Sequence, residues 1–177
     1  MKNKVVSFDP ASYRNLGWAT AEISYKKDEL KQVACEAGTF VTQGDDPWRV
    51  LWPMFVFIDD FLTLNKPDLA IIEDTKGFTG GFITGQVSQC MGVILAACVK
   101  HEIEVEFVYP SHVKKVVTGD GRATKSQIKN GVKSRLLAMG TEKDETKFNS
   151  GHAYDAVSNI LCWMIENPKI PYKGDIQ

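Results

Sequence analysis

Val5-Val6-Ser7-Phe8-Asp9-Pro10-Ala11-Ser12 is the stretch of this chain that decides the fold. An apolar run reaches Asp9 and meets Pro10 at once, which predicts a buried strand at 5–9 that ends at the rim of a sheet with one carboxylate. A second apolar run, Leu69-Ala70-Ile71-Ile72, leads to Glu73 in the same way. If the two strands are parallel neighbours, we expect their carboxylates to be adjacent.

The remaining periodic segments predict an α/β fold in one domain that spans 1–177. Three strands come first, then a helix, a strand, a helix, a strand and further helices. This order favours a mixed five-stranded sheet with helices on both faces. The strands are expected at 5–9, 17–24, 32–41, 68–73 and 104–109, and the helices at 48–64, 82–100, about 125–139 and 151–166.

Composition narrows the class of protein. The net charge of −1 excludes a general polyanion binder, and no apolar run approaches the ~20 residues of a membrane span. The first residues lead straight into a strand without the layout of a signal peptide. The four cysteines have no CxxC or CxxH spacing, so we interpret them as reduced thiols. We expect a cytoplasmic protein without a membrane partner.

A third acid completes a candidate catalytic cluster. His152, Asp155 and Asn159 share one face of the last predicted helix. Together with Asp9 and Glu73, His152 and Asp155 form a set of carboxylates and one imidazole that suits Mg²⁺, with Mn²⁺ as a substitute. Two ions in such a site support phosphodiester hydrolysis. Taken singly, each residue also fits a turn cap, a solvated acid or a helix cap.

A basic segment predicts one surface that faces nucleic acid. Residues 110–135 hold seven Lys and Arg side chains against Asp120 alone. On the predicted helix, Lys125, Lys129 and Lys133 form one stripe suited to phosphates, although a solvated helix face is the alternative. The other basic residues of the segment are Lys114, Lys115, Arg122 and Arg135.

The Gly-rich loop at 76–81 offers a second contact with DNA. Phe78, beside Lys76, is suited to stack on an unpaired base, and packing back onto the surface is the alternative. The helix after this loop carries a stripe of small residues, which permits contact with a partner helix or with the chain's own sheet. The stripe consists of Gly85, Ser88, Gly92 and Ala96.

Several motifs, in order along residues 4–165, resemble RuvC-type Holliday junction resolvases. The most specific is the block at 110–127, which is close to the family pattern P-x-x-V-K-x-x-V-T-G-x-G-x-A-x-K-x-Q. The others are Phe8-Asp9-Pro10-Ala11-Ser12 with Gly17-Trp18-Ala19, then Ile72-Glu73, Ser88-Gln89-Cys90-Met91-Gly92 and His152-Ala153-Tyr154-Asp155-Ala156.

The resemblance implies an RNase H-like fold and a homodimer that binds four-way DNA junctions and nicks two strands of like polarity with Mg²⁺. Catalytic and metal-binding roles carry over to Asp9, Glu73, His152 and Asp155. Lys114 and Lys125 match lysines that contact DNA phosphates in the family. The chain departs from the family pattern at Ala11, Met91, His152 and Lys76, where Gly, Arg, often Asp and an aromatic residue are usual.

Three other functions fit part of the pattern. An RNase H-like nuclease for other branched DNA or for structured RNA would keep the same acids. A non-catalytic junction-binding protein would keep the basic segment and would need no acid cluster. A sugar-kinase or actin-like ATPase also ends its first strand in Asp, but it needs two such domains, which 177 residues do not provide. The sequence does not identify motor partners.

Overall fold

The computed structural model describes residues 2–12, 14–26, 29–44, 46–74, 81–142 and 146–168. Its centre is a five-stranded mixed sheet in the order β3-β2-β1-β4-β5. The strands are β1 (Lys2–Ser12), β2 (Asn15–Lys26), β3 (Glu29–Val41), β4 (Leu69–Glu73) and β5 (Glu104–Val108). β1, β2 and β3 form an antiparallel meander, while β4 runs parallel to both β1 and β5. The predicted α/β architecture is therefore confirmed.

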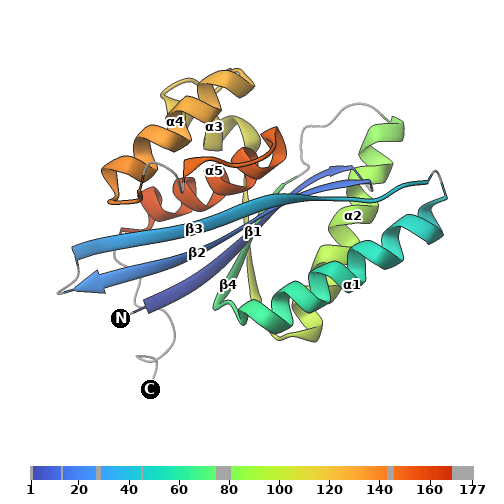
Figure 1. The fold of residues 1–177 in the computed structure, drawn as a ribbon. Helices are drawn as coiled ribbons and strands as arrows, with labels where there is room; N and C mark the ends of the chain where they lie inside the picture. The colour runs from blue at the N-terminus through green and yellow to red at the C-terminus, as the bar shows by residue number, and fades with distance from the viewer. Residues whose placement is uncertain are drawn as a thin grey trace.

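Helices cover both faces of this sheet (Figure 1). They are α1 (Pro47–Asn65), α2 (Gly81–Lys100), α3 (Pro110–Thr118), α4 (Lys125–Ala138) and α5 (Gly151–Glu166). Figure 1 shows α1 and α2 on one side of the sheet, and α5 with α3 and α4 on the other. α5 lies directly on β1 and β2, so the last helix of the chain packs against its first strands.

The alternation of side chains along the inner strands explains the two layers. Val5 and Ile71 point to the core under α5, whereas Val6 and Ile72 point to the core under α1 and α2. All four side chains are fully buried. Because successive strand residues face opposite sides, a strand that is apolar at every position requires cover on both faces. Burial of this apolar surface stabilises the packing of the helices on both faces of the sheet.

Two sequence-based expectations need correction. β1 does not end at Asp9 but continues through Pro10, which pairs with Leu16 of β2, to Ser12. The last β1 residue paired with β4 is Phe8, so Pro10 stands where β1 has only one neighbour and its missing N–H leaves no partner unsatisfied.

Helix α3 was not predicted. Pro110 was interpreted as the end of a strand, but it also opens the helix, with Tyr109 as N-cap. α4 begins as predicted, with Thr124 and Gln127 forming a complete capping box. Arg135 of α4 donates to the carbonyl oxygens of Val116 and Val117 at 2.5 and 2.8 Å, which ties the end of α3 to α4.

Among the helices in the described part of the chain, none combines the length and hydrophobicity needed to cross a bilayer.

Candidate active site

The register of the parallel strands places Asp9 beside Glu73. Phe8 pairs with Ile72 across β1 and β4, and each acid is the next residue of its strand. Asp9 lies just beyond the last paired residues of β1 and β4, at the rim of the sheet. Its side chain is largely buried, since the residue is only 6% exposed. Two acids at this edge require compensation, because burying a carboxylate without a partner is costly.

The start of α5 is fixed against the same edge. Ser150 caps the helix by accepting from the backbone N–H of Ala153 at 3.1 Å, and its hydroxyl also contacts that of Thr39 in β3. Gly17 of β2 lies between β1 and β3 at this edge, where it pairs with Asp9 on one side and with Thr39 on the other. A Cβ atom at Gly17 would lie 2.4 Å from the carbonyl oxygen of His152. A glycine is thus required for α5 to come this close to the sheet.

This close approach brings His152 and Asp155 to the acids. Nδ1 of His152 is 2.9 Å from Oδ2 of Asp9. Asp155, which is 6% exposed, completes a group in which one ligand atom from each of the three residues lies within 4.8 Å of the others. These oxygen and imidazole donors fit a divalent ion such as Mg²⁺ or Mn²⁺.

The electrostatics of the cluster also favour a bound cation. Burial, followed by the charges of Asp9 and Asp155, raises the pKa of Glu73 to about 8. Burial and the charge of Asp9 also raise the pKa of Asp155. The hydrogen bond with Asp9 raises the pKa of His152, against the opposing effect of burial. When several carboxylates are buried together without a cation, each raises the pKa of the others. This is the behaviour expected of a metal site from which the metal is absent.

Lys125 supplies a positive charge within the cluster. Its ammonium group, at the start of α4, contacts Oδ2 of Asp155. Burial lowers the pKa of Lys125, but the hydrogen bond and the charges of Asp155, Asp9 and Glu73 raise it more. The sequence predicted Lys125 on one basic stripe with Lys129 and Lys133, suited to phosphates, and the structure adds that its ammonium group lies against the acids.

The other basic residues spread from the acids over α3 and α4. Lys114 is close enough to Glu73 for its charge to lower the pKa of that carboxyl, although less than the acids raise it. Lys129 lies 5.4 Å from the ring centre of Tyr154 and is exposed. Lys115 and Arg122 are exposed, and Lys133 is half-buried.

The sequence predicted the four residues that the structure brings together, which are Asp9, Glu73, His152 and Asp155. It did not predict the contacts that hold α5 against the sheet beside them. The close approach at Gly17 and the contact between Thr39 and Ser150 carry no local signal, because their partners are more than 100 residues away. Lys76 and Phe78, predicted to contact DNA, lie outside the residues that the structure describes.

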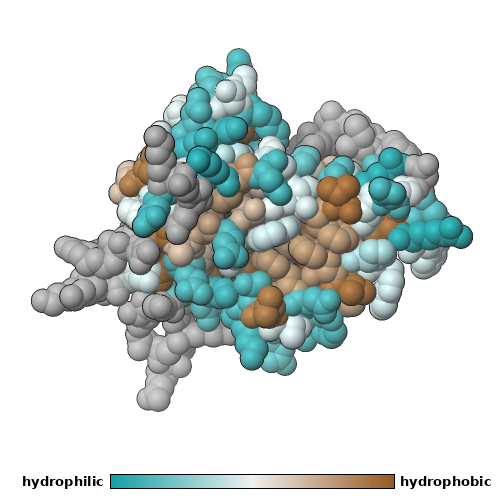
Figure 2. Space-filling view, viewed as in Figure 1, coloured by the Kyte–Doolittle hydropathy of each residue, from teal (hydrophilic) through white to brown (hydrophobic). Residues whose placement is uncertain are grey.

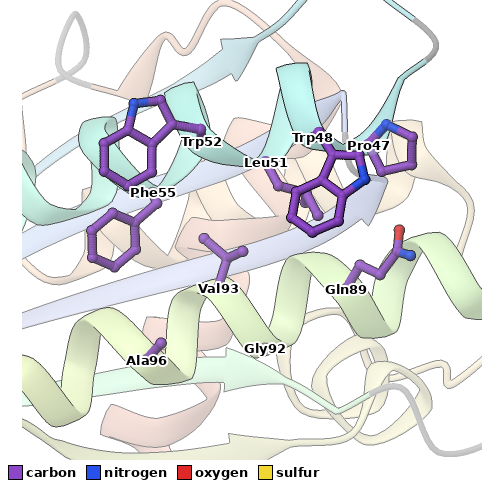
Figure 3. A pocket seen from close by; sticks show the side chains of 9 residues that line it. All are labelled: Pro47, Trp48, Leu51, Trp52, Phe55, Gln89, Gly92, Val93 and Ala96. Atoms are coloured by element: carbon purple, nitrogen blue, oxygen red, sulfur yellow. The ribbon is translucent and has the colours of Figure 1, made fainter.

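The small-residue stripe on α2 is exposed rather than packed on the sheet, and two of its residues, Gly92 and Ala96, line an apolar groove. α1 and α2 line a groove of about 640 Å³ with nine residues, among them Trp48 and Trp52 of α1 and Gly92 and Ala96 of α2 (Figure 3). Trp48 is 88% exposed and Trp52 is 66% exposed. Figure 2 shows hydrophobic patches among hydrophilic ones over α1. Apolar grooves with exposed aromatic side chains are a common feature of surfaces at which proteins associate.

A mixed β-sheet of this strand order, with Asp9 where β1 stops pairing with β4, Glu73 at the end of β4, and a helix crossing the sheet, is an RNase H-like fold. The sequence model of the family described as crossover junction endodeoxyribonuclease RuvC matches residues 5–162. The chain belongs to this family.

Relatives and solved structures agree with this assignment. A crossover junction endodeoxyribonuclease RuvC from Nitratidesulfovibrio vulgaris is 30% identical over 89% of this chain and 88% of its own length. The RuvC of Mycolicibacterium smegmatis is 34% identical over 63% of this chain, and the chain spans only 57% of that relative. Thermus thermophilus RuvC has the same fold, with a TM-score of 0.75 at 18% identity over 94% of this chain and 97% of the solved one. A second structure of that protein, with a TM-score of 0.71, 18% identity and 90% and 92% coverage, is in complex with a Holliday junction substrate.

Proposed function

We propose that this protein is a structure-specific endodeoxyribonuclease that resolves four-way DNA junctions by paired, metal-dependent nicks. The observation that carries the proposal is the cluster of Asp9, Glu73, His152 and Asp155 at one rim of the sheet, in a chain of the RuvC family. A protein that only binds junctions would have no need to bring several acids together, because uncompensated buried carboxylates destabilise a fold.

Asp9, His152 and Asp155 would hold one Mg²⁺ ion, and Glu73 with Asp9 a second. When bound, such ions polarise the scissile phosphate and make water a better nucleophile. The protein groups orient the site: the imidazole of His152 is fixed by Asp9, and α5 is fixed by its N-terminal cap. Lys114 and Lys125 bring positive charge to the same rim, which favours the approach of a phosphate.

We further propose that DNA lies along α3 and the start of α4. Lys114, Lys115, Arg122, Lys125, Lys129 and Lys133 would contact phosphates, and Lys76 with Phe78 would act at the crossover of the junction. Phosphate contacts position a protein on DNA without reading its sequence, which suits recognition of a branched shape. A DNA substrate also favours a cytoplasmic location.

The groove between α1 and α2 supports a homodimer. The same surface carries projecting indoles, Trp48 and Trp52, and small residues with open space above them, Gly85 and Gly92. A surface with both knobs and hollows is self-complementary, as a two-fold interface requires. Two active sites related by that axis would explain two nicks in strands of like polarity. Trp52→Glu should give a monomer in analytical ultracentrifugation, and Leu64→Glu, at an exposed α1 position outside the groove, should not.

The decisive experiment is incubation of the purified protein with a synthetic four-way junction and Mg²⁺, with the nicks mapped on all four strands. Two symmetric nicks on opposite strands, absent from linear duplex, fork and structured RNA controls, are expected. Equal cleavage of forks or of RNA would assign the protein to the broader class of RNase H-like nucleases, and binding without any nick would mark a junction-binding protein.

A further inference from the structure

A second group of side chains of the types that bind metals lies away from the acids, where α3 meets the end of α5. Nε2 of His112 is 2.5 Å from Oε1 of Glu166, and Sγ of Cys162 is 3.7 Å from Oε2 of the same carboxylate. One donor atom from each residue lies within 4.8 Å of the other two. Cys162 follows Asp155 by two helical turns, which is about 10 Å along α5 at 1.5 Å per residue.

We propose that His112, Cys162 and Glu166 form a site for a divalent transition metal, with Zn²⁺ as the best-suited ion. Imidazole nitrogen, thiolate sulfur and carboxylate oxygen are all ligands of Zn²⁺, and three protein ligands leave a fourth position for water. Mg²⁺ does not take thiolate ligands, so the donor set distinguishes this site from the one at Asp9 and Asp155.

The exposure of the three side chains suits binding. Cys162 is fully buried, and the half-exposed side chains of His112 and Glu166 stand at the surface, with exposed fractions of 47% and 44%. An ion can therefore enter between the two outer ligands and meet the thiol beneath them. Binding would open the contact between His112 and Glu166 slightly and would release the thiol proton of Cys162 to solvent.

The end of α5 at the site also favours a bound cation. Glu166 is at the C-terminal end of α5, whose last turn has no basic residue, so its negative charge adds to the negative end of the helix dipole.

The site would act by holding α3 in place. α3 is a short helix, and it carries Lys114 and Lys115. A metal bridge from His112 to α5 would fix the position of these lysines relative to Asp155 on the same helix. We therefore assign the site a positioning role, with no part in the chemistry at the acids.

Cobalt is the probe for this site, because a Co²⁺–thiolate bond gives a charge-transfer absorption that carboxylate and imidazole ligands do not. Protein stripped of transition metals and then supplied with excess Mg²⁺ is titrated with Co²⁺. We expect the thiolate band to saturate at one equivalent per chain, to disappear when Zn²⁺ is added, and to be absent from Cys162→Ser. Zn²⁺ should also raise the Tm of the wild type above its value in Mg²⁺ alone.

Two further variants complete the test. Cys98→Ser removes another fully buried thiol, on α2, and should leave the cobalt band unchanged. His112→Ala changes a half-exposed side chain and should fold, and it should weaken Co²⁺ binding roughly tenfold or more because one of three ligands is lost. Absence of the thiolate band in folded wild type, its persistence in Cys162→Ser, or unchanged affinity in His112→Ala would overturn the proposal and leave the group as an ion pair between α3 and α5.

Discussion

Gly17→Ala should abolish most of the cleavage activity while DNA binding persists. The added Cβ would lie 2.4 Å from the carbonyl oxygen of His152 and 2.8 Å from its carbonyl carbon, whereas ordinary contact begins at 3.4 Å. Because both neighbours are backbone atoms, no side chain can turn aside. The first turn of α5 must therefore move away from β2 by about 1 Å.

A movement of this size would disrupt the proposed metal site. His152 is 2.9 Å from Asp9, which is itself paired with Gly17, so the shift separates groups that must act together. A misplacement of about 1 Å can lower a catalytic rate roughly 100-fold. Overpacking at this point should also reduce the free energy of unfolding by about 1–3 kcal/mol.

The assay is the single-turnover rate on a four-way junction with Mg²⁺, together with gel-shift binding in EDTA and the Tm. Gly151→Ala is the matched control, because it is adjacent to His152 and its Cβ would meet nothing within 4 Å. We expect near-normal cleavage by Gly151→Ala. A cleavage rate close to wild type in folded Gly17→Ala would refute the argument that close packing of α5 on β2 sets the site.

Four further predictions follow from the charges of the site. Asp155→Asn should bind junctions but not cleave them; residual cleavage near the wild-type rate would remove Asp155 from the metal ligands. Lys115→Ala should lower the log–log salt slope of junction binding by roughly one, and an unchanged slope would mean that this face does not meet DNA. In metal-free protein the raised pKa of Glu73, about 8, makes stability fall as pH rises from 4.5 toward 8, so Glu73→Gln should have the higher Tm at pH 8 but not at pH 4. Asp9 raises the pKa of His152 above 6.5, so cleavage should decline with falling pH from above that value, and His152→Asp should extend activity to lower pH; superimposable profiles would show that His152 is not a ligand.

The sheet could be predicted from the sequence because its strands carry strong local patterns. Mainly apolar runs before Asp9 and Glu73 identified two strands buried on both faces, and the structure places them as parallel neighbours. α3 was missed because Pro110 fits both the end of a strand and the first turn of a helix. Sequence alone does not decide between the two when the helix has only nine residues.

The candidate site was predictable in its acids but not in its contacts. His152 and Asp155 share a helix face by spacing, so their partnership follows from periodicity. The same rule placed Lys125 on a stripe with Lys129 and Lys133, but it did not predict that the long side chain of Lys125 contacts Asp155, on a helix that packs against α4. The spacing of residues along a helix predicts the face on which a side chain lies. It does not predict which group of a neighbouring helix that side chain contacts.

The contact between Asp9 and His152 has a consequence for how the protein is made. The two residues are 143 positions apart, so the proposed ligand set is divided between β1 and α5. During synthesis, β1 leaves the ribosome long before α5 exists, and the contact forms only after the chain has closed on itself. A nascent or truncated chain that lacks α5 would have no complete set of ligands. The ability to cut DNA would therefore arise at the end of folding, when the finished fold can already restrict cleavage to its proper substrate.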